Sequence, residues 1–306
     1  MRAVTIVLIV LGVVIATLAV LYGVGTARIA RVETVDGAAI AAAPGAGFIQ
    51  TRSGRVHYLD VGSGPPMLLM HGSGRSIADW QQGAVEALSA HHRVIAFDYY
   101  GLGFSERNAA FTYGYDLWVQ EAVDLMDALN VEHVTVVGHS VGGALACILA
   151  ADHPSRVDHV VTIGTGMTIE PAQFLPAIPG VGEIALANAT AFGEVYSPEH
   201  RAQLEAAYRI RGTRAALLTY IRRQMTVDGL RLVFGVFEDV KVPVLHVSGA
   251  RDRNIPPEVA QRLTARTHGT FVSIDGAGHN VHIEAPQQLA QAIEAFLAAP
   301  PATLTP

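Results

Sequence analysis

The sequence predicts a doubly wound α/β fold with a mostly parallel sheet, preceded by one transmembrane helix. Six short apolar runs are rich in β-branched residues and lack alternation, which is typical of parallel strands buried on both faces. Amphipathic stretches lie between these runs, so strand and helix alternate along the chain. The chain has 306 residues, 50% of them hydrophobic, which suits one sizeable globular domain.

Residues 1–30 form the expected membrane segment. No charged residue occurs from Ala3 to Ala27, and ~20 apolar residues suffice to span hydrocarbon as a helix. A cleaved signal peptide, giving a secreted or periplasmic protein, is the alternative, because residues 25–27 offer a small-residue cleavage site; secretory apolar cores are usually only ~7 to 15 residues long. The arginines that flank the segment nearly balance, so the membrane side of the folded domain stays open. We therefore expect a single-pass membrane protein.

Residues 31–47 are expected to be a flexible tether, because they are rich in Ala and Gly and have no periodicity. The folded domain then covers residues 48–300 and opens with two edge strands, at Phe48–Thr51 and Arg55–Val61. The buried parallel strands are expected at Met67–Met70, Val94–Phe97, Val134–Val137, Val157–Ile163, Val242–Val247 and Thr270–Ile274. The helices are expected at 77–89, 115–129, 141–151, 256–267 and 286–297.

One interval, from 166 to about 238, carries no strand signal. Ser197-Pro198-Glu199 is typical of a helix start, and Gly212-Thr213 of a stop followed by a new start. The interval therefore predicts an inserted helical cap above the carboxyl ends of the strands, where ligands bind in open α/β folds.

The side chains of the cap predict two surfaces. The apolar ones suffice to roof a hydrophobic pocket, and most of them are expected to form the core of the cap. They are Phe174, Leu175, Ile178, Ile184, Leu186, Phe192, Leu204, Tyr208, Leu217, Leu218 and Ile221. Six arginines form the second set: Arg201, Arg209, Arg211, Arg214, Arg222 and Arg223. A cationic cap face against anionic lipid headgroups is one hypothesis for them, and an ordinary solvated helix face is the other.

Residues 138–143, Gly-His-Ser-Val-Gly-Gly, directly follow an apolar strand and open a helix. A G-x-S-x-G nucleophile elbow requires this strand, turn and helix context. Ser140 must hold a strained backbone there, and Gly138 and Gly142 remove side chains that would collide with neighbouring backbone. The helix N-terminus also favours developing negative charge. We predict Ser140 as a nucleophile; a glycine-serine turn without chemistry is the alternative.

A serine hydroxyl becomes a good nucleophile only when a base takes its proton, so an oriented histidine should follow downstream. Asp252 comes directly after one predicted strand and His279 after the next, at the same edge of the sheet. We predict Asp252 as the orienting acid and His279 as the general base. Asp228 or Asp239 is the alternative acid, and His282 is the alternative base.

An oxyanion hole needs two backbone N–H donors, one after the nucleophile and one from a neighbouring strand-to-helix loop. Val141 supplies the first, and Ser73, in the sequence His-Gly-Ser-Gly at 71–74, supplies the second. We expect no cofactor and no metal, since the H-E-x-x-H zinc motif and the phosphate-loop motif do not occur.

Together these residues resemble the α/β-hydrolase superfamily, in the branch of epoxide hydrolases, haloalkane dehalogenases, carbon–carbon bond hydrolases and monoacylglycerol-lipase-like esterases. The resemblance runs from about 55 to 297 and rests on HGSG at 71–74, DYYGLGFS at 98–105, GHSVGG at 138–143, Asp252 and GAGHNVHIEAP at 276–286. Epoxide hydrolases and dehalogenases of this branch use an aspartate at the elbow, so Ser140 argues against both activities. Many relatives carry an aromatic residue and a proline at Ser73-Gly74, which leaves the nearby pocket open to question.

We expect hydrolysis of a small apolar carboxylic ester, including a membrane-derived acylglycerol, through an acyl-enzyme at Ser140. Carbon–carbon bond hydrolysis of a diketone-like compound by the same triad is the alternative enzyme, and a non-catalytic, membrane-tethered binding module is the alternative from another class. A formal net charge of -6 without a basic run argues against nucleic acid. The sequence gives neither the acyl chain length nor the oligomeric state.

Overall fold

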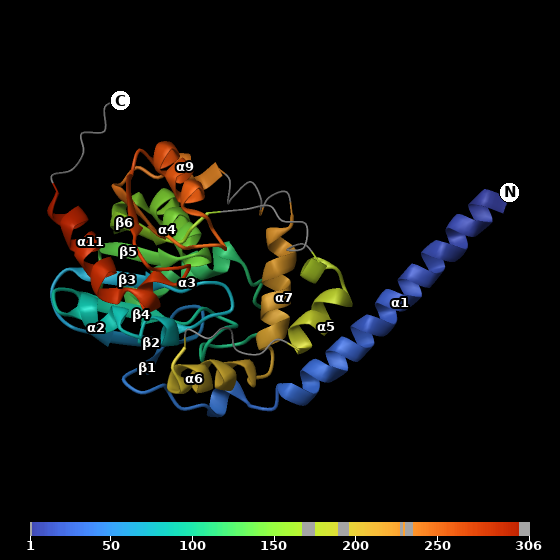
Figure 1. The fold of residues 1–306 in the computed structure, drawn as a ribbon. Coiled ribbons are helices and arrows are strands. Elements are labelled where there is room, and N and C mark those ends of the chain that lie inside the picture. The colour runs from blue at the N-terminus through green and yellow to red at the C-terminus, as the bar shows by residue number, and fades with distance from the viewer. Residues whose placement is uncertain (1, 167–174, 189–195, 227–228, 230–234, 300–306) are drawn as a thin grey trace.

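An eight-stranded sheet forms the centre of the computed structural model, which describes residues 2–166, 175–188, 196–226, 229 and 235–299 (Figure 1). The strands are β1 (Gly47–Gln50), β2 (Arg55–Val61), β3 (Pro66–Met70), β4 (Arg93–Phe97), β5 (Val134–His139), β6 (Val157–Ile163), β7 (Val244–Gly249) and β8 (Thr270–Ile274). Their order is β1-β2-β4-β3-β5-β6-β7-β8. Only β2 runs antiparallel to its neighbours, β1 and β4, so the prediction of a mostly parallel sheet is confirmed.

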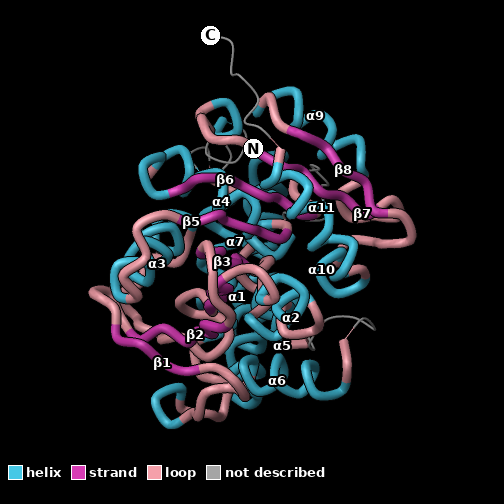
Figure 2. Tube along the Cα trace, turned by 90° about the vertical axis from the view of Figure 1, so that its left-hand side faces the viewer, coloured by secondary structure: helices cyan, strands magenta, loops and turns pink. Residues whose placement is uncertain are grey.

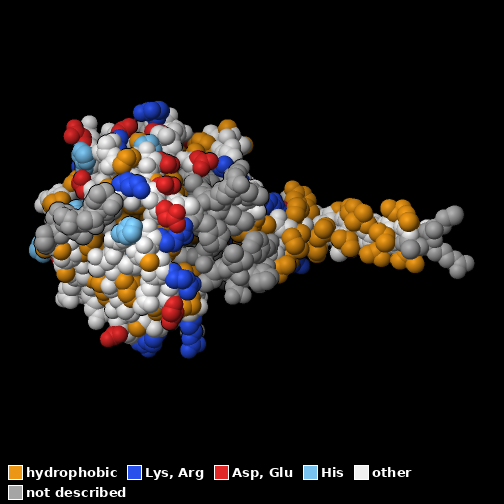
Figure 3. Space-filling model, turned by 90° about the horizontal axis from the view of Figure 1, so that it is seen from above, with side chains coloured by type: hydrophobic (Ala, Val, Ile, Leu, Met, Phe, Trp, Pro, Cys, Tyr) orange, Lys and Arg blue, Asp and Glu red, His pale blue; other side chains and the backbone are white. Residues whose placement is uncertain are grey.

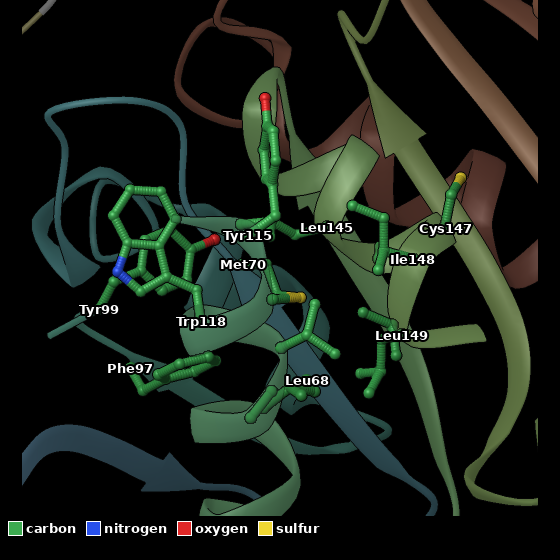
Figure 4. Close-up of a cluster of buried hydrophobic side chains, with 14 of the residues drawn as sticks. Leu68, Met70, Phe97, Tyr99, Tyr115, Trp118, Leu145, Cys147, Ile148 and Leu149 are labelled. Carbon is green, nitrogen blue, oxygen red and sulfur yellow. The ribbon is translucent and has the colours of Figure 1, made fainter. Parts of the chain in front are cut away.

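Helices cover both faces of the sheet (Figure 2). They are α2 (Ala84–Ser89), α3 (Tyr115–Ala128), α4 (Val141–Asp152), α9 (Pro257–Thr267), α10 (Val281–Glu284) and α11 (Pro286–Ala298). Alternate residues of a strand point to opposite faces. In β3, Leu68 and Met70 therefore pack with α3 and α4, as Figure 4 shows, while Met67 and Leu69 pack with α2 and α11. Burial on both faces explains why the strand reads as an uninterrupted apolar run.

Three local features differ from the expected elements. The single helix expected at 77–89 is instead a short 3-10 turn, Ile77–Asp79, followed by α2, with Gly83 at φ 123° between them. β2 lies inside the sheet rather than at its edge, and β8 is the second edge strand, with Thr270 and Ser273 exposed. The short helix α10, which follows His279 closely, was not expected.

The inserted cap lies between β6 and β7 and contains α5 (Val181–Ala187), α6 (Pro198–Tyr208) and α7 (Thr213–Gln224). Several of the apolar cap residues form its core, as expected for most of them: Leu204, Tyr208, Leu217 and Leu218 are buried. Leu175 and Ile178 are 50% and 38% exposed. Phe174 and Phe192 lie outside the described residues.

The N-terminal helix α1 (Arg2–Val32) projects from the domain and carries apolar side chains around its free part (Figures 1 and 3). It is long and apolar enough to cross a membrane. Its second half packs on α5 through one stripe of less exposed residues, Leu18, Leu21, Gly25 and Ile29. A Cβ atom at Gly25 would lie 2.5 Å from Cβ of Glu183, so this close approach requires glycine.

The segment 31–47, expected to be a flexible tether, is fixed to the domain in the structure. The buried carboxylate of Glu33 accepts the N–H groups of Gly212 and Arg214, each at 2.7 Å, at the N-terminus of α7. An anion is stabilised there by the free N–H groups and the helix dipole. Further along, the N–H of Ala43 donates to Nε2 of buried His57 at 3.1 Å. Side-chain contacts of this kind leave no periodic trace in the sequence.

Replacing Glu33 with Ala is expected to loosen the start of α7. The substitution removes two N–H acceptors and leaves buried Arg214 without its carboxylate, 3.5 Å away, at a cost of about 2 kcal/mol. Faster hydrogen exchange in residues 212–216 and a lower melting temperature would report the loss. Asp36→Asn is the control, because the pair of Asp36 with Arg211 is exposed and such pairs contribute under ~1 kcal/mol. Equal effects of the two substitutions would contradict the expectation.

Candidate active site

Ser140 lies at the turn between β5 and α4 with φ 53° and ψ -115°, a left-handed conformation that is strained for a residue with a side chain. A Cβ atom at Gly138 would lie 2.1 Å from the carbonyl oxygen of Gly142, and one at Gly142 would lie 2.1 Å from that of Met70. Both glycines are therefore required by backbone contact. The turn lifts the serine side chain above the carboxyl end of β5.

Asp252 and His279 lie together at the carboxyl ends of β7 and β8. Nδ1 of His279 is 2.8 Å from Oδ2 of Asp252, while Oδ1 of Asp252 accepts the N–H groups of Asn254 and Ile255. The carboxylate is almost fully buried, and these donors stabilise its charge. Because the carboxylate can only accept, the proton of the neutral imidazole lies on Nδ1, which leaves Nε2 as a base.

The loops that carry Ser140 and His279 are in direct contact. Nε2 of His139 is 3.1 Å from the carbonyl oxygen of His279, and the N–H of Ser140 donates to Ile163. A Cβ atom at the next residue, Gly164, would lie 3.0 Å from Nδ1 of His279. The Ser140 hydroxyl makes no hydrogen bond to His279 in the structure; such catalytic bonds are often long before substrate binds.

The two predicted oxyanion donors also lie at this edge. Val141 is the first residue of α4, so its N–H has no acceptor within the helix. Ser73 lies in the loop after β3. The carbonyl oxygens of Met70, the last residue of β3, and of His71 lie close to Gly142 of the elbow. The hydroxyl of Tyr208 in the cap donates to the carbonyl of Gly74 at 3.0 Å, which fixes this loop.

The alternative site residues lie elsewhere. Asp239 is exposed near the end of the cap, and Asp228 lies outside the described residues. His282 is buried and faces Asp79, with Nε2 3.7 Å from Oδ2 of that residue. Among the described residues, only Asp252 hydrogen-bonds the imidazole ring of His279.

His139 is a residue whose part in the site the sequence analysis missed, although it directly precedes Ser140. Burial lowers the pKa of His139 well below its ordinary value, and the nearby His282 and His279 lower it further, so the ring is neutral. Because a carbonyl oxygen accepts, the proton lies on Nε2 and is donated to His279. His139 therefore ties the turn that carries Ser140 to the loop that carries His279.

Replacing His139 with Leu is expected to lower kcat about tenfold, because the carbonyl of His279 loses a hydrogen bond of roughly 1 kcal/mol and the base loses its fixed position. His139→Gln keeps an N–H donor and should recover most of the rate. KM should change little in both variants. A lower rate in both variants with equal loss of melting temperature would indicate packing alone, and would contradict the positioning role.

Asp79, His139 and His282 bring three potential metal-ligand atoms within 4.8 Å of one another, all buried. However, Nε of Arg75 lies 4.0 Å from Asp79, and the hydroxyl of Tyr196 donates to the same carboxylate at 2.9 Å. Positive charge already faces the carboxylate, and a second cation would be repelled. We assign no metal to this cluster.

Asp98 organises the loop after β4, which contains the motif at 98–105. Its buried carboxylate accepts the N–H groups of Ile77 and Phe104 and a ring N–H of His57, each at 2.7 Å. Burial alone would raise the pKa of Asp98, but these partners outweigh burial and lower it. A Cβ atom at Gly103 would lie 1.9 Å from Cγ of Asp98, so the loop closes tightly around the carboxylate.

Comparison with known proteins identifies the family. Residues 65–205 match a family model described as the alpha/beta hydrolase fold. Over 255 residues the chain is 31% identical to a 2-hydroxy-6-oxo-2,4-heptadienoate hydrolase of Pseudomonas putida, covering 78% of this chain and 91% of that protein. The chain belongs to the α/β-hydrolase family. This α/β-hydrolase is also 31% identical, over 256 residues, to a 2-hydroxymuconate semialdehyde hydrolase of a Pseudomonas species, with 80% of this chain and 90% of that one covered.

Solved structures of similar proteins point the same way. A meta-cleavage product hydrolase from Pseudomonas fluorescens, CumD, has a TM-score of 0.64 and 25% identity, covering 82% of this chain and 97% of its own. A serine hydrolase of carbazole degradation, CarC, has a TM-score of 0.65 and 25% identity, covering 83% and 98%. The prediction of a hydrolase is confirmed. The expectation of carboxylic ester cleavage is wrong, because these relatives are meta-cleavage product hydrolases and match the alternative enzyme.

Proposed function

We propose that this α/β-hydrolase cleaves a carbon–carbon bond beside the ketone of a 2-hydroxy-6-oxo-dienoate, through Ser140, His279 and Asp252. The observation that carries the proposal is the 31% identity to two dienoate-type hydrolases over 78% and 80% of the chain. The pairing of His279 with Asp252 and the strained turn at Ser140 supply the chemistry. The reaction needs no cofactor, and the acyl group is the part of the substrate that varies.

The chemistry follows from the substrate class. In the 2,6-dioxo tautomer, the carbon released on cleavage is conjugated through a double bond to the C2 ketone, which makes it a good leaving group. The oxygen of Ser140 attacks the C6 carbonyl while Nε2 of His279 takes its proton, and the N–H groups of Ser73 and Val141 stabilise the oxyanion. The C5–C6 bond then breaks, its electrons move to the C2 oxygen, and His279 returns the proton there. Water, activated by His279, releases the acid.

Arg75 is proposed to bind the carboxylate that every dienoate carries. It follows the oxyanion loop, its side chain is largely buried, and its guanidinium lies 4.9 Å from the ring of Tyr196 in the cap. A buried guanidinium recognises a carboxylate strongly. We expect Arg75→Met to raise KM for dienoates about tenfold or more, at roughly 1.5–3 kcal/mol for such a bond, and to leave KM for neutral esters unchanged. Equal changes for both substrates would contradict this assignment.

A substrate panel tests the proposed function. The purified chain is offered 2-hydroxy-6-oxo-dienoates with methyl, phenyl and longer C6 substituents, and p-nitrophenyl esters of matching acyl groups. We expect rapid loss of the dienoate absorbance, with one oxygen of labelled water in the released acid, and slower ester turnover. A fluorophosphonate probe should label Ser140. Labelling without dienoate cleavage would contradict the proposed substrate, and absence of labelling would indicate a non-catalytic binding module.

We infer that α1 is retained as a membrane anchor rather than removed as a signal peptide. Cleavage after residue 27 would remove Leu18, Leu21 and Gly25 and uncover the face of α5 that they pack against. In the retained helix, α1 instead continues without a break to Val32, and the next residue, Glu33, is bound to α7. The mass of the mature chain tests this inference: an N-terminus near residue 28 would contradict it.

A further inference from the structure

Exposed large hydrophobic side chains are confined to one side of the molecule. Among the described residues they occur only along α1 and at Leu175 and Ile178 of the cap. Figure 3 shows the apolar side chains of α1 extending away from a domain surface that is otherwise mixed in character. We call residues 175–188, which include α5 and both exposed cap residues, the cap edge.

The cap edge lies directly against α1. A Cβ atom at Gly180 would lie 2.5 Å from the carbonyl oxygen of Leu18 and 3.1 Å from Cβ of Leu21. Gly25, one further turn along, approaches Glu183 equally closely. The exposed side chain of Ile178 therefore lies two residues from the contact, and the apolar surface of α1 continues onto the cap edge.

The free part of α1 is too short to cross a bilayer alone. From Val4 to Leu18 the helix rises about 21 Å at 1.5 Å per residue, whereas the hydrocarbon core is about 30 Å thick. The remaining ~9 Å must come from the part of α1 that packs on the cap edge. That depth agrees with the ~5–10 Å to which interfacial helices enter a bilayer.

The charges around the contact fit this placement. Glu183 is the one charged residue in the cap edge; it is buried, and its carboxylate accepts from Arg222 at 2.8 Å and from the N–H of Gly180 at 2.7 Å. On α1, exposed Tyr22 lies at the height of the cap edge, as expected for an interfacial aromatic ring, and exposed Arg28 follows at headgroup height. The headgroup hypothesis for Arg222 and Arg223 is not supported, since both pair with acids.

We propose that the cap edge lies in the interfacial layer of the bilayer that α1 crosses, with Leu175 and Ile178 in contact with lipid. This proposal rests on retention of α1 as an anchor and is independent of the bond that the enzyme cleaves. Two contacts then hold the cap at the membrane. The first is the packing of the stripe from Leu18 to Ile29 of α1 against α5, and the second is the contact of the cap edge with lipid.

Fluorescent labels in reconstituted full-length protein test the proposal. Native Cys147 is buried and is replaced by Ser. Single cysteines at Ile178, at Val14 in the free part of α1, and at exposed Ala90 each carry an environment-sensitive nitrobenzoxadiazole group. Ala90 directly follows α2, which lies far from the free part of α1 in Figure 1. The vesicles are phosphatidylcholine with bromine near the headgroup or deep in the acyl chains. We expect blue-shifted emission and shallow-bromine quenching at 178, deep-bromine quenching at 14, and neither at 90.

The other outcomes separate the anchor from the cap edge. Quenching at 14 with water-exposed emission at 178 would overturn the cap-edge proposal and leave the anchor. Water-exposed emission at both positions would overturn the anchor on which it rests. Blue-shifted emission at 178 without lipid quenching, but with energy transfer between labelled copies, would indicate a contact between two chains and would also overturn the proposal.

Discussion

Replacing Ser140 with Ala is expected to lower turnover of a dienoate by roughly 10⁴-fold or more, because triad residues act as a unit and no acyl-enzyme can form. The backbone of the elbow is held by contacts that do not involve the hydroxyl, including the N–H of Ser140 to Ile163 at 2.8 Å. Folding and substrate binding should therefore be preserved. Steady-state kinetics on the loss of dienoate absorbance, with KM determined separately, measures the effect.

Ser73→Ala is the matched control for this experiment. Its predicted contribution is a backbone N–H, which alanine keeps, so we expect less than a tenfold loss. If Ser140→Ala kept more than a tenth of the wild-type rate, water activated directly by His279 would be the nucleophile, and the covalent mechanism would be wrong. The two substitutions therefore separate the hydroxyl that reacts from the backbone that stabilises charge.

The sequence predicts the positions of Ser140, Asp252 and His279 because each follows a strand directly. Parallel strands end at the same edge of the sheet, so the loops after β5, β7 and β8 all lie along that edge. The bond from His139 to the carbonyl of His279 joins residues 140 positions apart and depends on side-chain direction. Local patterns carry no information of that kind, and for the same reason composition alone suggested a free tether where Glu33 is bound to α7.

The sequence motifs do not specify which kind of bond is cleaved, and the reason is chemical. Ester hydrolysis and carbon–carbon hydrolysis begin with the same attack of a serine oxygen on a carbonyl carbon, so both reactions require the same elbow, base and oxyanion donors. What differs is the leaving group and the pocket that stabilises it. Arg75, which we propose to bind the carboxylate of the substrate, follows the recognised motif at 71–74 by one residue. The similarity to the dienoate-type hydrolases, rather than any motif, favours carbon–carbon bond cleavage over ester cleavage.

Replacing Asp98 with Ala is expected to destabilise the fold by about 3–5 kcal/mol. The substitution removes a buried carboxylate and leaves three donors, from His57, Ile77 and Phe104, without an acceptor. Gly103 packs closely against the same carboxylate, so the substitution would also leave a cavity beside Gly103. Chemical denaturation measures the loss. Asp60→Ala is the control, because the Asp60–Arg93 pair is partly exposed and should cost under ~1 kcal/mol.

The pH dependence of the Asp98 contribution gives a sharper test. The partners of Asp98 lower its pKa in the folded chain, whereas an unfolded aspartate titrates near ~3.9. Its stabilisation is therefore complete above that unfolded pKa, and it is lost as the pH falls through the lower folded value. The difference in unfolding free energy between wild type and Asp98→Asn should be constant from pH 6 to 8 and shrink toward pH 3. A difference that stayed constant down to pH 3 would mean that the charge of Asp98 contributes nothing, and that the loop after β4 is held by shape alone.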